Sequence, residues 1–467
     1  MRYRVERDTL GELSIPEDAY YGVQTARALS NFPISGLRFQ RHFIRSLALI
    51  KYAAAKANAS LGLLPKDKAE AIMKAAMEVV NGDHDSQFVV DVLQTGSGTS
   101  TNMNANEVIA NRAVEILGGK RGDKALIHPN DHVNMCQSTN DVFPTSIHVA
   151  AVELVKSRLI PSLKELENAL NKKADEFKDV VKSGRTHLQD AVPVTLGQEF
   201  GGYAEMIRKG TVRLNRVVED LLELPIGGTA TGTGLNAHPE FAGLVVNTLN
   251  EITDLGFRIA RDRFEAMGSK DSCVELSGVL RVIAGSLLKI CNDLRLLASG
   301  PNTGLAEIDI PAVQPGSSIM PGKVNPVIIE STMLACCLVI GNDEAVFQAS
   351  RIGELELNMG MPLIGYSLIQ SIEVLSNAAA NLARQCISGI TANVDVCKRY
   401  AESSPALVTV IAPIIGYDKA AVIAKRFLNE KKSLRDLLIE EGVQRERVEK
   451  MLDLLKLTRG GLPSLER

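Results

Sequence analysis

The chain has 467 residues, of which 45% are hydrophobic, and it carries a formal net charge of −3. A chain of this length buries a large core and exceeds one ordinary domain. The charge leaves no basic surface of the kind that binds nucleic acid or anionic membrane, and no uninterrupted apolar run is long enough to span a bilayer. We therefore expect a globular protein with neither nucleic acid nor a membrane as its partner.

The N-terminus and the cysteines indicate a cytoplasmic protein. Residues 1–8 are charged and contain no apolar signal core. The seven cysteines are scattered apart from one adjacent pair, and this usage is typical of reduced thiols. His128 and His132 are four residues apart, but Pro129 lies between them, which excludes a helical zinc motif. We expect no metal and no other cofactor.

The predicted elements change in character along the chain. Residues 1–137 mix short helical stretches with polar loops. In the segments that follow, apolar residues recur every three or four positions, as on one face of a helix. The predicted long helices span 163–181, 197–223, 275–298, 327–350 and 364–386. Short charged helices follow residue 392.

These patterns predict an all-α protein built on a long central helical bundle. The helix at 275–298 is apolar on nearly every side, which is typical of a helix buried in a bundle or at a subunit interface. The predicted organisation is an N-terminal domain at 1–137, a central long-helix domain at 138–392 and a small helical C-terminal domain at 393–467.

Three clusters of hydroxyl and amide side chains interrupt the helical pattern. They lie at 94–104, 128–141 and 183–190. A single Ser, Thr, Asn or Asp can cap a helix, and we expect Asn140 or Asp141 to cap the helix that follows. Capping needs one such residue and not five in a row. The remaining hydroxyl and amide groups could bind a dicarboxylate, because such a ligand needs many neutral donors and few fixed charges.

His187 is the best candidate for a general acid or base by residue type, since only histidine titrates near neutral pH without perturbation. A single histidine can equally be structural. Thr186 lies beside it and Glu330 is available as a polarising partner. This combination favours a catalytic role.

The most informative segment begins at residue 316 and reads Gly-Ser-Ser-Ile-Met-Pro-Gly-Lys-Val-Asn-Pro. Ser317 and Ser318 lie among glycines and prolines, so they belong to a flexible loop. Lys323 and Asn325 offer an ammonium and an amide to an anionic ligand just before a helical run. The residue after the lysine is valine, whereas a phosphate-binding loop needs Ser or Thr there. A plain turn with a solvated lysine is the alternative.

Together these clusters resemble the fumarase/aspartase superfamily, whose lyases eliminate water or an amine from succinyl-type substrates. The similarity extends from about Arg4 to the C-terminus and includes a characteristic glycine-rich turn at 227–236. The resemblance implies an all-α homotetramer in which helices of all subunits form one shared bundle, with each active site completed by three subunits. Such symmetry would bring together clusters that are far apart in the sequence.

The resemblance also implies a role for each matched residue. Ser317 would abstract the proton from the carbon next to a carboxylate, and Lys323 would stabilise the charge that develops there. His187, paired with Glu330, would handle the leaving group. The implied substrate-binding residues are Ser97, Thr99, Ser138, Thr139, Asn140, Thr186, Ser318 and Asn325. The implied secondary carboxylate site consists of His128, Asn130 and Asp131.

The resemblance is mixed within the superfamily. Ser97, His128 and the run at 262–266 look like class II fumarase, whereas Thr139 and the run at 19–22 look like aspartase. We favour a fumarase, which hydrates fumarate to L-malate reversibly through an aci-carboxylate carbanion; an aspartate ammonia-lyase is the alternative. Lyases of argininosuccinate or adenylosuccinate match less well. A silent structural oligomer, like the lens proteins of the superfamily, is disfavoured because all four implied catalytic residues are present.

Overall fold

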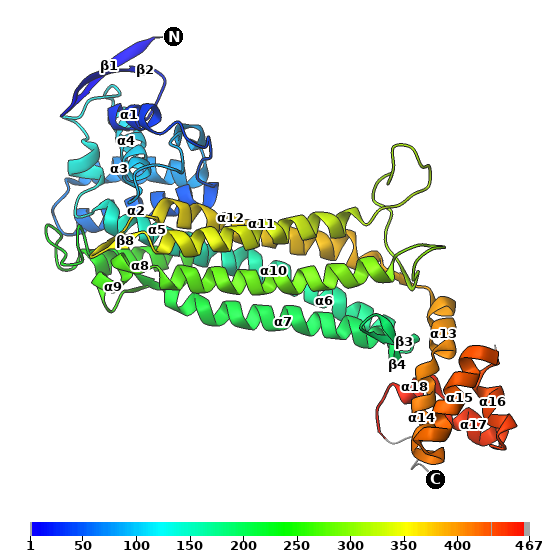
Figure 1. Cartoon of the computed structure of the whole chain (residues 1–467). Coiled ribbons are helices and arrows are strands. Elements are labelled where there is room, and N and C mark those ends of the chain that lie inside the picture. Colours follow the sequence, from blue (N-terminus) through cyan, green and yellow to red (C-terminus); the bar gives the residue numbers. More distant parts are fainter. Residues whose placement is uncertain (1, 431, 462–467) are drawn as a thin grey trace. The chain divides into compact units, whose positions relative to one another are not determined.

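The computed structural model describes residues 2–430 and 432–461. Helices dominate the described chain, and its strands form only two-stranded sheets. The long helices are α6 (Ile160–Glu176), α7 (Leu196–Leu221), α10 (Asp271–Leu297), α11 (Val327–Ser350) and α12 (Met361–Gln385) (Figure 1). They correspond to the five segments predicted from apolar periodicity, so the expected all-α fold built on long helices is confirmed.

Contacts divide the chain into two compact units. Unit 1 comprises Met1–Pro161, Gly210–Ala284 and Ala335–Asn377. Unit 2 comprises Ser162–Lys209, Gly285–Leu334 and Ala378–Arg467. Each unit therefore combines three separate stretches of sequence. The domain boundaries near 138 and 392 stay predictions.

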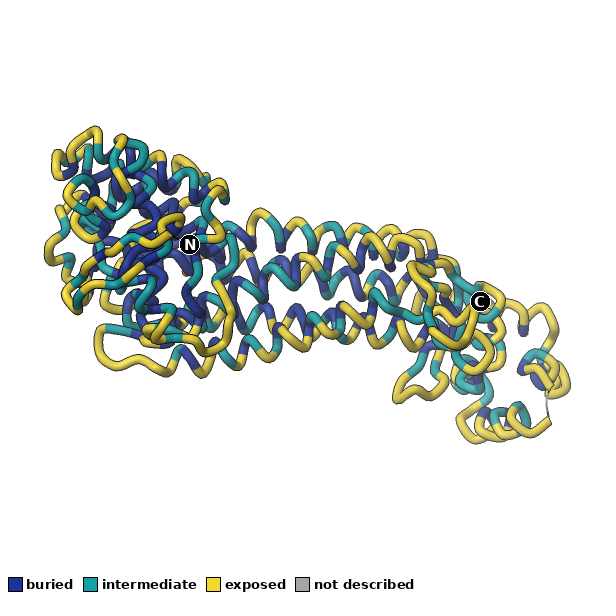
Figure 2. The backbone as a smooth tube through the Cα atoms, turned by 90° about the horizontal axis from the view of Figure 1, so that it is seen from above, coloured by how far each residue is buried: buried dark blue, intermediate teal, exposed yellow. Residues whose placement is uncertain are grey.

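In unit 1, helices surround α2 (Arg41–Ser60) and bury most of it. Its neighbours are α3 (Lys66–Asn81), α4 (Thr99–Ile116), α5 (Thr139–Leu154) and α8 (Phe241–Thr253). Alanines dominate the C-terminal half of α2 and let these helices approach closely, while Phe43 and Leu47 fill the space nearer its start. Figure 2 shows this concentration of buried backbone in the N-terminal part of the chain.

Unit 1 also contains short elements. They are β1 (Tyr3–Asp8), β2 (Gly11–Pro16), α1 (Val23–Asn31), η1 (Asp85–Gln87), η2 (Pro129–Val133), η3 (Val155–Leu159), β5 (Glu223–Leu224), β6 (Arg258–Ile259), α9 (Arg263–Gly268), β8 (Gly353–Glu354) and β9 (Leu357–Asn358). β1 and β2 pair as an antiparallel hairpin. The sequence pattern did not predict this hairpin.

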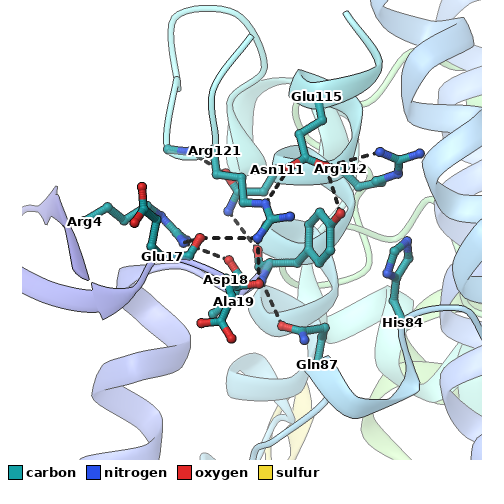
Figure 3. Close-up of polar contacts among 12 residues, drawn as sticks. Arg4, Glu17, Asp18, Ala19, His84, Gln87, Asn111, Arg112, Glu115 and Arg121 are labelled. Atoms are coloured by element: carbon teal, nitrogen blue, oxygen red, sulfur yellow. Dashed lines mark hydrogen bonds and ion pairs between the residues drawn. The ribbon is translucent and has the colours of Figure 1, made fainter. Parts of the chain in front are cut away.

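Polar contacts hold the N-terminal segment onto unit 1 (Figure 3). Arg4 donates hydrogen bonds to four backbone carbonyl groups within residues 16–21. The Arg121 guanidinium carbon lies 3.9 Å from the centroid of the Tyr20 ring, and the Tyr20 hydroxyl donates to Glu115 at 2.8 Å. Arg121 in turn donates to Glu115 at 2.6 Å. These contacts fix the position of the hairpin on the unit.

His148 on α5 is buried in a way that changes its titration. Its Nδ1 hydrogen-bonds with the Glu223 carbonyl oxygen at 2.9 Å. Burial, assisted by the nearby Lys270 cation, lowers the pKa of His148 to about 4. The ring therefore stays neutral at physiological pH.

We expect this histidine to make the fold sensitive to acid. Because the folded pKa lies below the unfolded value of 6.5, the neutral ring stabilises the fold above pH 6.5, and that stability is lost as the pH falls toward 4. The loss at pH 5 is about 2 kcal/mol. Thermal denaturation at pH 7 and pH 5 should show a smaller drop in Tm for His148→Gln than for the wild type. The exposed His238→Gln is the matched control, and an equal drop in all three proteins would assign the sensitivity to other groups.

In unit 2, a hairpin and a small helical cluster accompany the long helices. The strands are β3 (Val181–Thr186), β4 (Gln189–Thr195), β7 (Ile308–Asp309) and β10 (Thr391–Ala392), with β3 paired to β4 and β7 to β10. The C-terminal elements are η4 (Ile387–Gly389), α13 (Val394–Ser403), η5 (Pro405–Leu407), α14 (Val408–Ile415), α15 (Tyr417–Glu430), α16 (Leu434–Glu440), α17 (Arg445–Met451) and α18 (Leu454–Leu457). The predicted short helices are confirmed.

One predicted boundary is wrong. The apolar pattern extends the helix at 163–181 to Val181, whereas α6 ends at Glu176 and Val181 begins β3. Phe177 lies just beyond the helix end and is buried, so the apolar pattern continues past the last helical residue. Periodicity alone therefore does not locate the end of the helix.

The described residues also show what the fold lacks. None of the helices in 2–430 and 432–461 is long and apolar enough to cross a membrane. Within the same residues, no group of three or more His, Cys, Asp and Glu side chains is arranged to hold a metal ion. None of the seven cysteines, all of which lie in the described residues, forms a disulfide.

Candidate functional site

The first predicted substrate-binding stretch lies at the N-terminus of α4. Gly98 precedes the helix with a φ of 83°, and a Cβ at this position would overlap the Phe143 ring, so only glycine fits. The helix begins at Thr99, which is half-buried. The hydroxyl oxygens of Ser97 and Thr99 are 2.8 Å apart. Both hydroxyls therefore lie at the start of this helix.

The second stretch lies at the N-terminus of α5, where Ser138 is the capping residue. Its Oγ accepts from the Asn140 N–H at 3.3 Å, and Asp141 accepts from the Ser138 N–H at 2.9 Å, which is a capping box. The expectation that Asn140 or Asp141 caps this helix is therefore wrong for the N-cap position, which Ser138 occupies, whereas Asp141 supplies the other half of the capping box. The buried Asp141 carboxylate also accepts from the N–H groups of Gly227 and Thr229, at 2.9 Å each. Burial raises the pKa of Asp141 to about 6.

A single side chain joins the two helix N-termini. Asn102, one turn into α4, donates from Nδ2 to the Thr139 Oγ1 at 2.9 Å. Asn140 is half-buried beside this contact and donates to the Ala230 carbonyl at 2.8 Å. Helix N-termini favour anions, because the helix dipole is positive there. Two such ends lined with hydroxyl and amide groups have the properties of a carboxylate site.

A buried polar layer supports these helix ends. Lys51 on α2 is fully buried and donates to the side-chain oxygens of Asn134 at 2.9 Å and Gln137 at 3.0 Å. Burial lowers the pKa of Lys51 to about 7. Asn106 also donates to Asn134, at 3.2 Å. Part of the Asn-rich run thus forms buried hydrogen bonds that support the helix ends. The sequence contains no pattern that reveals the role of Lys51.

A cavity of about 510 Å³ opens at the N-terminus of α4. Thr99 lines it together with His128 and Asn130, which are two of the three residues predicted as a secondary carboxylate site. Arg7 and Lys124 line the same cavity. These two cations were not predicted, because Arg7 and Lys124 are far apart in the sequence and meet only in the fold, where the Lys124 ammonium donates to the Arg7 carbonyl at 2.8 Å.

His128 caps the N-terminus of the π-helical turn η2. Its Nδ1 accepts from the N–H groups of Asn130 and Asp131, at 3.2 Å each. The Asp131 carboxylate lies 3.4 Å from the same nitrogen. An accepting Nδ1 places the proton of the neutral ring on Nε2. The structure therefore brings all three predicted residues of the secondary site into one turn.

The third predicted stretch forms the tip of the β3–β4 hairpin. His187 and Leu188 have φ values of 56° and 58°, so they form a two-residue turn between the paired residues Thr186 and Gln189. Such a turn usually carries Asn-Gly, and other residues are strained in it. Thr186 and His187 are both exposed at the tip.

The loop that contains the two serines closes on itself. A Cβ at Gly316 would overlap the Lys323 carbonyl oxygen, and the Asn325 amide donates to the Gly316 carbonyl. Ser317 is half-buried, and its Oγ accepts from the Met320 N–H at 3.0 Å. Ser318 is exposed in the same loop. The serine pair therefore lies in a compact loop with adjoining ends.

Two cavities in unit 2 group the predicted residues of this loop. Lys323, Asn325 and Glu330 line a cavity of about 1100 Å³, with Glu330 in the first turn of α11. Ser317 and Lys323 line a second cavity of about 390 Å³. His187 lines neither of these cavities. Within the described chain, no hydrogen bond or ion pair joins His187 to Glu330.

Comparisons with known proteins agree over the whole length of the chain. A family model described as Lyase matches residues 11–341, and one described as Fumarase C C-terminus matches residues 407–459. The relative named fumarate hydratase class II from Mycobacterium tuberculosis (strain CDC 1551 / Oshkosh) is 50% identical, covering 98% of this chain and 96% of that protein. The relative of the same name from Nitrosomonas europaea is 49% identical, covering 98% and 99%.

Two solved structures have the same fold. The class II fumarase of Schistosoma mansoni superposes with a TM-score of 0.94 at 38% identity, covering 98% of this chain and 99% of that chain. A fumarate lyase:delta crystallin from Brucella melitensis, solved bound to cobalt, superposes with a TM-score of 0.94 at 47% identity, covering 98% and 100%.

Proposed function

This chain belongs to the class II fumarate hydratase family of lyases, and from that premise we propose that it catalyses the reversible hydration of fumarate to L-malate. The observation that carries the proposal is the pair of helix N-termini joined by Asn102 and Thr139. They present neutral hydroxyl and amide donors in place of fixed cations. A dicarboxylate held in this way binds well enough to react and still leaves as product.

The proposed chemistry begins with a proton on the carbon next to a carboxylate. In the dehydration direction, Ser317 removes this proton, and the electron pair moves into the carboxylate to give an aci-carboxylate. Lys323 and Asn325 hold the carboxylate while its charge increases. Stabilising this dianion is the largest requirement of the reaction, because the carbon is only weakly acidic.

The surroundings of Ser317 support its role as the base. A serine removes a proton only if its alkoxide is stabilised. The Ser317 Oγ already accepts from the N–H groups of Ile319 at 3.3 Å and Met320 at 3.0 Å. Hydrogen bonds donated to an oxygen favour its anionic form. A loop that closes over the substrate would exclude water and strengthen both contacts.

We assign the opposite side of the substrate to the hairpin tip. Thr186 binds the reacting carboxylate, and His187 donates the proton with which the hydroxyl group leaves as water and takes a proton back in the hydration direction. Glu330 polarises His187 when the two meet in the assembled site. Ser97, Thr99, Ser138, Thr139, Asn140 and Ser318 complete the substrate contacts in this proposal.

We propose a homotetramer in which three subunits complete each site. Leu334 on α11 is 72% exposed, and Leu338 and Phe347 on the same helix are also exposed. Val282 on α10 is a fourth large apolar side chain facing outward. Exposed apolar residues along long helices mark a surface that another subunit covers. Association of this kind would also bring the clusters of different subunits together.

The family and the absence of disulfides among the described residues support two further assignments. We propose that His128, Asn130 and Asp131 form a secondary carboxylate site at the cavity that Arg7 and Lys124 also line. The cations there would attract a dicarboxylate. We also place the protein in the cytoplasm, where cysteines do not form lasting disulfides.

The substrate is tested by offering the purified protein fumarate, L-malate and L-aspartate separately. We expect interconversion of fumarate and L-malate and little or no ammonia from L-aspartate. An amine is usually cationic and needs acceptors at the leaving-group side, and each misplaced acceptor costs about 1–3 kcal/mol. Two such mismatches separate the activities by several powers of ten. Ammonia release that exceeds malate dehydration under matched conditions would make the protein an aspartate ammonia-lyase.

A further inference from the structure

A fully buried carboxylate lies at the base of the hairpin that carries His187. Glu307 is 0% exposed. Its oxygens lie 3.0 Å and 3.1 Å from Arg185 Nη1, and the Lys182 ammonium is 3.0 Å from Oε2. Lys182 is also buried and is paired with Glu199 at 2.8 Å. Two cations from β3 thus meet two carboxylates, and the charges balance.

Such a cluster holds its members in one arrangement. A charge inside a protein is tolerated only when it is paired and hydrogen-bonded, so each partner has few alternative positions. Arg185 is fixed by a charged contact to both oxygens of one carboxylate. The strand that carries Arg185 is fixed with it.

The hairpin tip depends on this anchor. Arg185 directly precedes Thr186, and the turn of His187 and Leu188 follows. The tip is exposed, so no core packing orients it. The strand register shifts between Ser183 and Arg185, which is a bulge at Gly184. This irregular pairing makes an anchor at the base of the hairpin more important for its orientation. The orientation of the tip is therefore set from its base.

Glu307 is itself held by backbone contacts on its other side. Its N–H donates to the Leu297 carbonyl at 2.9 Å, and its carbonyl accepts from the Asn393 N–H at 2.9 Å. It directly precedes β7, which pairs with β10. The carboxylate thus belongs to a part of unit 2 that is tied to the end of α10 and to the start of the C-terminal cluster.

We propose that Glu307 is a positioning residue for catalysis: by holding Arg185 it orients the strand that presents Thr186 and His187 to the substrate. This inference rests on the proposed function, because it assigns its effect to His187. It differs from a role in stability alone, since the anchored strand ends in the residue that moves the proton.

A double-mutant cycle tests this inference. Glu307→Gln keeps the shape of the side chain and removes its charge. We expect it to lower kcat by about tenfold or more while KM changes by less than about threefold, because misplacement of a reacting group by 1 Å has effects of this size. In the His187→Asn background the same substitution should change kcat by less than about twofold, because residues that act as one unit are not additive.

Two further variants complete the design. Glu165→Gln breaks an exposed ion pair with Arg384 in the same unit and is the matched control, with wild-type kcat expected. Arg185→Lys keeps the cluster neutral overall if Glu307→Gln does not fold. It loses the planar guanidinium contact, and its kcat should fall in the wild type and not in the His187→Asn background.

The outcomes distinguish a failure of the proposed function from a failure of the positioning role of Glu307. If the wild type does not hydrate fumarate, or if His187→Asn is fully active, the proposed function or the role of His187 fails. If both hold and Glu307→Gln leaves kcat unchanged, or lowers it equally in both backgrounds, the positioning role alone is overturned. A lowered Tm with normal kcat per folded enzyme would show that Glu307 only stabilises the fold.

Discussion

Replacing Ser317 by alanine should lower kcat by about a hundredfold or more and leave KM similar, as the loss of a general base does. The serine hydroxyl is the proposed proton acceptor, and no other hydroxyl in the loop accepts two backbone N–H bonds among the described residues. Substrate binding should survive, because it depends on the helix N-termini and on Lys323. Steady-state kinetics with L-malate, at concentrations on both sides of KM, would measure the two parameters separately.

Ser331→Ala provides the control for this experiment. Ser331 is exposed on α11, and its hydroxyl only donates to the Ile328 carbonyl of its own helix. Its replacement should leave kcat and KM unchanged. Near-normal turnover of Ser317→Ala would assign proton removal to another group.

Activity should increase when two variants of strongly reduced activity are assembled together. Ser317→Ala and His187→Asn each lack one proposed catalytic group. If a site takes these groups from different subunits, random assembly gives both intact groups to about one site in four. Unfolding and refolding an equal mixture should therefore restore about a quarter of wild-type activity per site, measured after isolation of the mixed tetramers.

The controls for complementation are each variant refolded alone and the double variant Ser317→Ala/His187→Asn refolded with either one. None of these assemblies contains a site with both groups, so all should stay inactive. Mixed tetramers that form and remain inactive would show that Ser317 and His187 act within a single subunit.

Apolar periodicity predicts the long helices well because each of them buries one continuous stripe. The segment predicted at 327–350 coincides with α11, and the segments predicted at 197–223 and 275–298 differ from α7 and α10 by a few residues at their ends. Helix termini depend on capping contacts, which are made by single residues and leave only a weak pattern. This is why Ser138 was missed as the cap of α5.

The hairpins were missed for a different reason. β3 is short and carries Lys182 and Arg185 as inward-facing side chains, so it lacks the alternation of apolar and polar residues that predicts a strand. The turn at His187 and Leu188 lacks the glycine or asparagine that usually marks a hairpin. The ion pairs at its base are made by residues far apart in the sequence, and they form only in the folded chain.

The polar clusters were identified from the sequence, but the sequence did not show which members bind a ligand and which support the fold. Thr99 and Asn140 lie at half-buried helix ends, as a substrate-binding role requires. Asn102 and Asn106 come from the same runs and are buried among other amides. A sequence shows where donors are plentiful. Which of them meet a ligand and which support the fold is decided by the packing of α2 against α4 and α5.

The closed loop at 316–325 carries the proposed base Ser317, and its tip lies outside the core. Its ends are joined at Gly316 and Asn325, just before α11 begins at Val327. Ile319 and Met320 form the exposed tip and contribute nothing to the core. Extra residues inserted between them would lengthen the loop at small entropic cost and move Ser317 away from its N–H donors. For protein engineering, the tip is thus a site where a ligand-binding peptide can be inserted. Binding of the ligand to that peptide would change the position of Ser317, and with it the activity, while the fold stays intact.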